Sequence, residues 1–179
     1  GLALPPLGPH ATLAPRALPA GRIGFSSQSG ALGLALLEKA AQRALGFSAF
    51  ASIGNKADVS SNDLLEWWEE DDATDLVLLY LESFGNPAKF SRTARALSYR
   101  KPVVAVKVGG AADERWDEPE AWPTGATGAA LLGQTGSLRG ANTPRMFHTA
   151  GVLAPQPLHA ATRVGGVTTR GDHTGRAVR

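Results

Sequence analysis

One apolar segment, Leu76–Leu81, limits most strongly what this chain can fold into. A strand that is apolar at every position is covered on both faces, as central strands of parallel sheets are. Three more segments have the character of strands, at Arg22–Ser27, Phe47–Ile53 and Pro102–Val108, and amphipathic stretches separate them. Strands and helices that alternate at this spacing predict an α/β fold, with a parallel sheet between two layers of helices.

The intervening helices have local start and stop signals. Apolar residues recur in each stretch at helical spacing, which marks a buried stripe. A Ser–Asp pair resembles a capping box, Asn followed by Pro favours a helix start, and Gly is common just past a helix end. The predicted helices are Ala31–Leu45 with Gly46 beyond its end, one opened by Ser60 and Asp63 that runs to about Glu70, and one that starts at Asn86 and Pro87.

The two ends of the chain and one internal stretch have no such pattern. Residues 1–20 contain five of the 12 prolines and are predicted to be an extended linker. The domain itself is predicted at 21–155, with an irregular surface excursion at 109–130. Order is expected again near Gly133, followed by a short helix from Thr143 and a strand at Val152–Leu153. The basic stretch 156–179 is expected to be a disordered tail.

Composition excludes several classes of function. The chain has no cysteine, so it has no disulfide framework, thiolate catalysis or cysteine zinc site. The four histidines lack the spacing of metal ligands, and no metal site is predicted. A net charge of +2, spread along the sequence, does not indicate a nucleic-acid partner. No apolar run approaches the ~20 residues of a membrane span, and the composition fits a cytoplasmic protein.

The turn after the first predicted strand is the sharpest candidate for a binding site. In an open parallel sheet this turn lies at the carboxyl edge, where ligands usually bind. Free N–H groups at the start of the following helix favour an anion such as phosphate. The alternative is that Ser27 or Ser29 only caps the helix. The candidate phosphate-binding residues are Ser27, Gln28, Ser29 and Gly30.

Two further candidates also follow predicted strands. In the loop Gly54–Asp58, the residues of interest are Asn55, Lys56, which has a cationic side chain suited to a phosphate, and Asp58, which can hold the loop by local hydrogen bonds. A solvated turn is the alternative there. Glu82 ends the buried strand, so we expect a partly desolvated carboxylate able to orient an imidazole. A structural hydrogen bond to the next loop is the alternative for Glu82.

Four blocks carry a family resemblance, in order and at suitable separations. They are Gly21–Gly33, Gly54–Ser60, Tyr80–Pro87 and Arg100–Lys107. Together they resemble the succinyl-CoA ligase-like flavodoxin domain of the NDP-forming acyl-CoA synthetases, which include the ADP-forming acetate–CoA ligases. The resemblance implies a flavodoxin-like three-layer fold. The sequence Ala11–Arg16 is similar to the corresponding segment of bacterial proteins in which this module is joined to an acetyltransferase domain.

What the family does is implied by the resemblance alone. An acyl phosphate forms, its phosphoryl group passes to a histidine, and the histidine carries it toward a nucleotide. The implied ligands are CoA and ATP/ADP. CoA would be held mainly by a Rossmann-type domain and the nucleotide, with Mg, by an ATP-grasp domain, both as partners in the same chain or as subunits. Ser29 and Gly30 would lie beside the phosphohistidine, and Glu82 would orient its imidazole.

The family histidine is replaced in this sequence. The segment Gly133–Leu138 matches the Ser-His-Thr-Gly-Ser-Leu-like motif, with Gln134 at the histidine position and Gly136 and Ser137 after it. An amide lacks a nitrogen of comparable nucleophilicity, so it cannot accept and pass on a phosphoryl group. The path from Lys107 to Gln134 is also longer than the family usually needs.

Three hypotheses for function follow. The first is a ligase-family domain without independent turnover, which senses acyl-CoA or a nucleotide beside an acetyltransferase. The second is an active piece of an ADP-forming acid–CoA ligase in which His148 or another residue carries the phosphoryl group. The third is a truncated fragment without function, which the unpatterned 109–130 segment and the basic tail favour.

Overall fold

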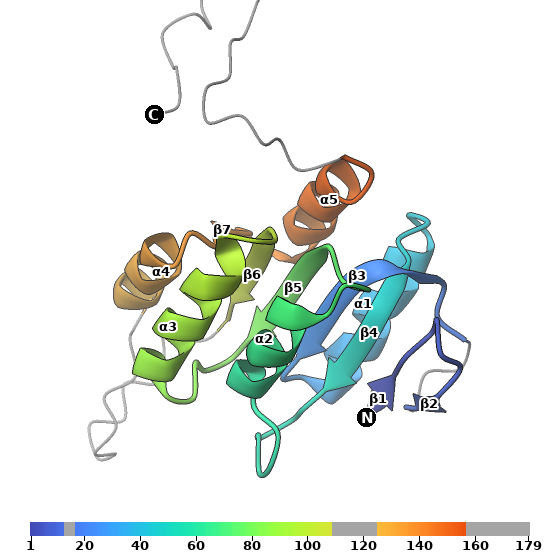
Figure 1. Ribbon diagram of the computed structural model, residues 1–179, viewed down its shortest axis with the longest axis horizontal. Coiled ribbons are helices and arrows are strands. Elements are labelled where there is room, and N and C mark those ends of the chain that lie inside the picture. The colour runs from blue at the N-terminus through green and yellow to red at the C-terminus, as the bar shows by residue number, and fades with distance from the viewer. Residues whose placement is uncertain (13–16, 109–124, 157–179) are drawn as a thin grey trace, which may run out of the picture.

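The computed structural model describes residues 1–12, 17–108 and 125–156. In that part of the chain one sheet and five helices are present (Figure 1). The strands are β1 (Leu2–Ala3), β2 (His10–Ala11), β3 (Ala20–Ser27), β4 (Phe47–Ser52), β5 (Leu76–Leu81), β6 (Val103–Lys107) and β7 (Leu138–Arg139). The helices are α1 (Gly30–Ala41), α2 (Ser61–Glu70), α3 (Pro87–Ser98), α4 (Gly125–Gln134) and α5 (Thr143–Leu153).

The sheet has the strand order β2-β1-β4-β3-β5-β6-β7. From β4 to β7 all neighbours are parallel, whereas β1 pairs antiparallel with β4 and β2 pairs antiparallel with β1. Numbered along the chain, the five parallel strands follow the order 2-1-3-4-5 of a flavodoxin-like sheet. The predicted α/β class, with a three-layer flavodoxin-like arrangement, is confirmed.

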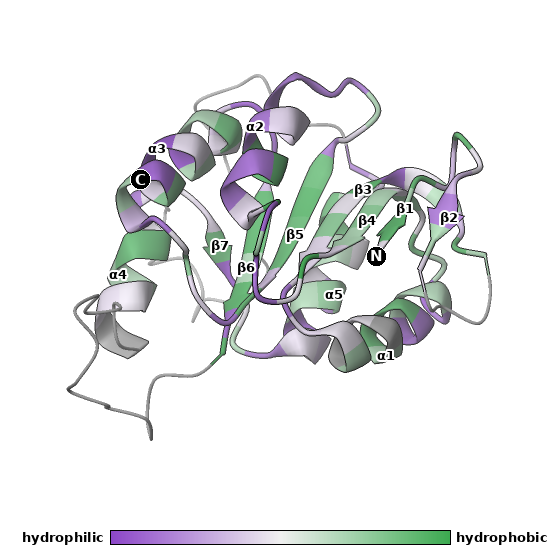
Figure 2. Ribbon diagram, turned by 90° about the horizontal axis from the view of Figure 1, so that it is seen from below, coloured by the Kyte–Doolittle hydropathy of each residue, from purple (hydrophilic) through white to green (hydrophobic). Residues whose placement is uncertain are grey.

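Helices cover both faces of the sheet. Helices α1 and α5 lie on one face, and α2, α3 and α4 lie on the other (Figure 2). Each face has its own core: Phe25 and Phe147 meet edge to face in the first, and Trp68 and Phe90 both belong to the second. Every residue of β5 is buried, because β5 lies between the two cores as its apolar run predicts.

Two of the predicted helices are confirmed with their signals. Helix α2 follows Ser60, whose N–H and hydroxyl both donate to Asp63 Oδ2, at 2.9 and 2.6 Å. Helix α3 begins at Pro87, and Asn86 accepts a hydrogen bond from the Lys89 N–H. These starts depend on residues three positions apart, so local sequence is enough to place them.

The prediction for residues 1–20 is wrong at its amino-terminal end. Residues 2–3 and 10–11 are strands, and Ala3 is fully buried against β4. The segment carries no strand pattern of its own. Its pairing depends on the unpaired edge of β4, which lies some 50 residues away along the chain.

The predicted end of the first helix is also wrong. Helix α1 stops at Ala41, and Ala44 takes a left-handed backbone with φ of 54°. Gly46 does not cap the helix: a Cβ there would lie 2.3 Å from the Ala20 carbonyl oxygen. The chain therefore leaves the helix early, which lets Gly46 pack directly against the start of β3 while Leu45 enters the core. The side chain of Leu32, which belongs to the predicted buried stripe, lies outside the described part.

The carboxyl-terminal half differs from the prediction in two more places. Helix α4 occupies 125–134, so residues 125–130 are helical where an irregular excursion is predicted, and α5 continues through Val152 and Leu153, where a strand is predicted. Helix α4 is rich in Gly and Ala, so its sequence gives little periodic signal. The rest of the predicted excursion and nearly all of the predicted tail lie outside the described residues. No helix in the described ranges is long and apolar enough to cross a membrane.

Candidate functional site

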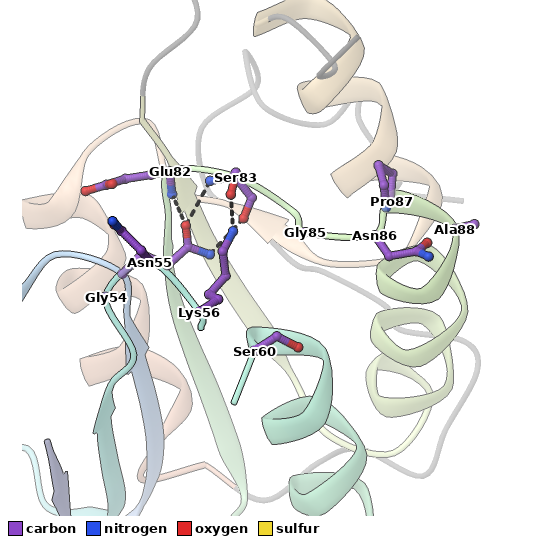
Figure 3. A pocket seen from close by; sticks show the side chains of 11 residues that line it. Gly54, Asn55, Lys56, Ser60, Glu82, Ser83, Gly85, Asn86, Pro87 and Ala88 are labelled. Carbon is purple, nitrogen blue, oxygen red and sulfur yellow. Dashed lines mark hydrogen bonds between the residues drawn. The ribbon is translucent and has the colours of Figure 1, made fainter. Parts of the chain in front are cut away.

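An open cleft of about 840 Å³ lies at the carboxyl edge of the parallel strands (Figure 3). It lies at the switch point of the sheet, where the chain leaves β3 for one face and β5 for the other. Three segments that follow strands meet there, together with the starts of α2 and α3. The lining residues are Gln28, Gly54, Asn55, Lys56, Ser60, Glu82, Ser83, Gly85, Asn86, Pro87 and Ala88.

Gln28 links the segments that form the cleft. Its Oε1 accepts from the N–H groups of Glu82 and Ser83, both at 2.8 Å. Its Nε2 donates to the Ser83 carbonyl at 2.7 Å and to the Ser61 hydroxyl at 3.2 Å. The residue is only 5% exposed, and both polar atoms of its amide have protein partners. The Gln28 amide therefore has internal contacts, while Gln28 also lines the cleft and its predicted contact with phosphate stays a prediction.

The neighbouring serines form a local turn. The Ser27 hydroxyl donates to the Ser29 carbonyl at 2.8 Å and accepts from the Ser29 N–H at 3.2 Å, and Ser27 is fully buried. Ser29 is the N-cap of α1, yet its side chain makes no capping hydrogen bond. A Cβ on Gly30 would approach one protein atom within 4 Å, the Ser52 hydroxyl at 3.9 Å. The first turn of α1 thus has room beside it, and its N–H groups have no intrahelical acceptor.

Lys56 supplies a cation to the cleft. Its backbone is left-handed, with φ of 59°, a conformation that non-glycine residues take mostly where the surroundings impose it. Its ammonium group donates a hydrogen bond to the Ser83 hydroxyl (Figure 3). Burial lowers the pKa of Lys56 below its usual range, and the charge of Glu82 acts against that change. Asn55 also lines the cleft, whereas Asp58 is exposed and is not among the lining residues.

Glu82 does not have the partly desolvated carboxylate that its position predicts. The residue is exposed, and its side chain extends away from Ser83 and Lys56 (Figure 3). The strand ends at Leu81, so burial ends there too, and Gln28 holds only the backbone of Glu82. Its charge nevertheless acts on three neighbours. Burial raises the pKa of Tyr80 and the charge of Glu82 adds to that rise. Burial lowers the pKa of Lys56 and of Lys107, and the charge of Glu82 opposes both changes.

Two residues of this edge were missed by the sequence analysis. Ser83 accepts a hydrogen bond from the Lys56 ammonium and makes two hydrogen bonds to Gln28, but a serine after a strand gives no distinctive signal. Lys107 ends β6, and its ammonium donates to the Val108 carbonyl at 2.7 Å. Burial lowers the pKa of Lys107, and so does the nearby charge of Lys56. The position of Lys107 at the end of a buried strand was the signal from which this second cation could have been found.

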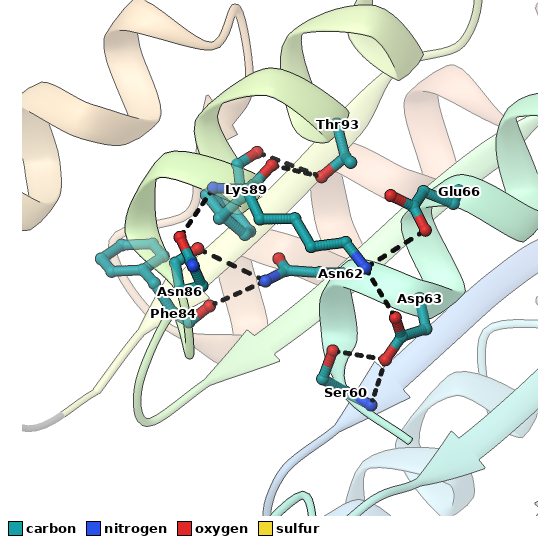
Figure 4. A network of polar contacts seen from close by, with 9 residues as sticks. Ser60, Asn62, Asp63, Glu66, Phe84, Asn86, Lys89 and Thr93 are labelled. Atoms are coloured by element: carbon teal, nitrogen blue, oxygen red, sulfur yellow. Dashed lines mark hydrogen bonds and ion pairs between the residues drawn. The ribbon is translucent and has the colours of Figure 1, made fainter. Parts of the chain in front are cut away.

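The starts of α2 and α3 are joined beside the cleft (Figure 4). The Lys89 ammonium pairs with Asp63 at 2.8 Å and Glu66 at 3.2 Å. The Asn62 amide donates to the carbonyls of Phe84 and Asn86, at 3.5 and 3.4 Å. These contacts fix the two helix starts relative to each other, so that their N-terminal ends both face the cleft.

The Gln134 segment lies at the opposite edge of the sheet. Leu138 pairs with Val104, at the beginning of β6, so residues 134–137 precede the amino ends of the strands. Arg95, in the last turn of α3, donates to the Gln134 carbonyl at 2.8 Å. Gly136 has φ of 75°, and the Ser137 hydroxyl contacts that of Thr135 at 2.9 Å. The structure therefore does not bring Gln134, Gly136 and Ser137 together with Glu82 and Ser29.

The histidines lie elsewhere too. His10 is in β2 and His148 is exposed on α5, and neither lines the cleft. His159 and His173 fall outside the described residues. Within the described ranges, no three His, Cys, Asp or Glu side chains are grouped so that they could hold a metal ion.

Fold and site together define a flavodoxin-like α/β domain with a cationic cleft at its switch point. The chain belongs to the succinyl-CoA ligase-like flavodoxin domain family, whose model matches residues 20–153. The chain is 33% identical over 163 residues to the alpha subunit of acetate–CoA ligase [ADP-forming] I from Pyrococcus furiosus, covering 88% of this chain and 35% of that protein. It is 47% identical over 89 residues to acetate–CoA ligase [ADP-forming] I from Archaeoglobus fulgidus, covering 50% of this chain and 13% of that one.

A solved structure has the same architecture. The dinucleotide forming acetyl-coenzyme A synthetase 1 of Ca. Korarchaeum cryptofilum, in complex with phosphate and ADP, matches with a TM-score of 0.81 and 30% identity. The match covers 90% of this chain and 36% of that one. This chain therefore corresponds to part of larger ligases, and spans about a third of the length of the Pyrococcus subunit.

Proposed function

We propose that this chain is a phosphate-binding domain of an ADP-forming acyl-CoA synthetase-like protein and has no ligase turnover of its own. The observation that carries the proposal is the Lys56 ammonium group, held at the cleft by Ser83. It faces a space bordered by the starts of α2 and α3, and the positive ends of these two helix dipoles favour an anion. Lys107 adds a second positive charge at the same edge.

Absence of turnover is proposed from the missing phosphoryl carrier. Gln134 stands at the family's histidine position, and its amide cannot carry a phosphoryl group. None of the residues that line the cleft in the described part of the chain is a histidine. His148 lies on α5 and does not line the cleft, which argues against the alternative in which His148 is the carrier.

The remaining functions would need partner domains. We propose that CoA or acyl-CoA binds with a Rossmann-type domain, and ATP/ADP with Mg binds in an ATP-grasp domain. In that setting the chain would sense acyl-CoA or nucleotide without transferring phosphate. A neighbouring acetyltransferase domain belongs to the same proposal, and the adjoining coding sequence would test for it.

The phosphate site is tested with inorganic phosphate and a pair of matched variants. Lys56→Met removes the ammonium from the cleft, and we expect it to weaken binding about tenfold, as the loss of one charge-assisted contact does. Lys39→Met removes the same charge from the exposed face of α1 and should leave affinity unchanged. Calorimetric titration of the wild type and both variants is the measurement. Equal losses in the two variants would show only a general effect of charge.

A further inference from the structure

The Gln28 amide is placed so that it governs the geometry of the whole Glu82–Ser83 turn. Ser83 is bonded to it through both its N–H, at 2.8 Å, and its carbonyl, at 2.7 Å. The N–H of Glu82 is bonded to the same oxygen. Three bonds from one buried side chain thus fix two successive residues of a segment that follows β5.

The contacts between Gln28 and Ser83 also affect the Lys56 ammonium. The Ser83 hydroxyl accepts the hydrogen bond from the Lys56 ammonium. Lys56 lies on a turn after β4, so the orientation of Ser83 bears directly on where the Lys56 ammonium lies in the cleft. Gln28 therefore acts on Lys56 through Ser83, although it does not touch Lys56 in any described contact.

We propose that Gln28 is a positioning residue of the cleft, whose amide holds the Glu82–Ser83 turn in the geometry that places the Lys56 ammonium for an anion. The inference rests on the proposed phosphate-binding function. An amide suits this place because it offers an acceptor and a donor in one plane. A glutamate keeps both acceptor bonds but puts an oxygen against the Ser83 carbonyl, and a methionine makes neither kind of bond.

The test uses the chain with Gln28→Met and Gln28→Glu, and with Ser26→Ala as the control. Ser26 is a fully buried residue of β3, two positions before Gln28, and its hydroxyl has no hydrogen-bond partner in the described part of the chain. Three quantities are measured by NMR: exchange of the Glu82 and Ser83 amide hydrogens, the side-chain titration of Lys56, and the response to inorganic phosphate. If Gln28→Met does not fold, Gln28→Glu carries the comparison.

We expect Gln28→Met to speed exchange at Glu82 and Ser83 and to return the Lys56 pKa toward its usual value, since the side chain would leave its half-buried place. Phosphate affinity should fall about tenfold, the scale of one contact to a charged group. Gln28→Glu should leave exchange at Glu82 and Ser83 close to that of the wild type, because it keeps both acceptor bonds. It should still raise the Lys56 pKa and weaken phosphate binding, because it loses the bond to the Ser83 carbonyl and adds a negative charge. Ser26→Ala should change none of the three quantities.

Faster exchange at Glu82 and Ser83 with an unchanged Lys56 titration would overturn the inference, because the amide would then have a structural role alone. A wild-type chain that gives no response to phosphate would refute the proposed function instead. In that case the Lys56 titration still decides whether Gln28 positions the ammonium. The two failures are therefore distinguishable within one set of samples.

Discussion

At the scale of single residues, two positions between α1 and β4 both suit glycine, but for different reasons. Ala44 has φ of 54°, where glycine is at ease and an L side chain is strained. Gly46 has an ordinary backbone, but a Cβ there would lie within 2.9 Å of Ala20 and Gly21 backbone atoms. Glycine would therefore fit at position 44, where the chain has alanine, and glycine is required at position 46.

We predict that exchanging these residue types separately gives effects of opposite sign. Ala44→Gly should change the free energy of unfolding by less than about 1 kcal/mol and in the stabilising direction, because relief of strain exceeds the added chain entropy. Gly46→Ala should destabilise by about 2 kcal/mol or more, because backbone atoms would have to separate. Urea denaturation of both variants checks this. A destabilised Ala44→Gly would show that the left-handed turn is not strained.

The same scale explains which site residues sequence could identify. Lys56 and Gln28 were found because they follow strands that end at one edge of a parallel sheet. The role of Gln28 could not be identified from the sequence, because its partners Ser61 and Ser83 are 33 and 55 residues away along the chain. The exposure of Glu82 could not be predicted either, because burial ends with the strand at Leu81 and no local sequence pattern marks that point.

At the scale of elements, α2 shows how a helix start is tied to its neighbour. Asp63 accepts bonds from Ser60 at its own helix start and from Lys89 of α3. The bond from Lys89, and then those from Ser60, lower the pKa of Asp63 well below its usual range. A carboxyl whose pKa is lowered in the fold contributes stability above its unfolded pKa and loses that contribution as pH falls toward the folded value.

We therefore predict that Asp63→Asn costs about 1 kcal/mol at neutral pH, the scale of a lost helix cap. The difference from the wild type should shrink as pH falls below about 4, the unfolded pKa of an aspartate, because the wild type then loses its carboxylate too. Unfolding curves between pH 7 and pH 2.5 measure this. Glu38→Gln, on the exposed side of α1, is the control and should show no such convergence. A constant difference across the range would mean that the charge of Asp63 contributes nothing.

At the scale of the whole molecule, features that depend on residues close together in the sequence could be predicted, and features that depend on residues far apart in the sequence could not. The strands β5 and β6 and the starts of α2 and α3 depend on neighbouring residues, and they were predicted. Strand β1 exists because β4 offers an edge, and its residues carry no strand pattern. Helix α4 has too few large apolar residues to show a period. The position of Gln134 at the amino edge follows from the pairing of β7 with β6, and motif matching contains no such information.

The last prediction concerns phosphoryl transfer, which needs more than this domain. The described cleft is lined by one lysine, Lys56, and by no histidine, and the chain matches about a third of the Pyrococcus alpha subunit. We therefore expect no acid-labile phosphate on the chain after incubation with labelled ATP, either alone or with an ATP-grasp partner. An ADP-forming acetate–CoA ligase incubated in parallel should be labelled, which shows that the assay works. Label on His148 would mean that α5 moves so that His148 reaches the cleft, and it would replace the proposal of an inactive domain with that of an unusual carrier.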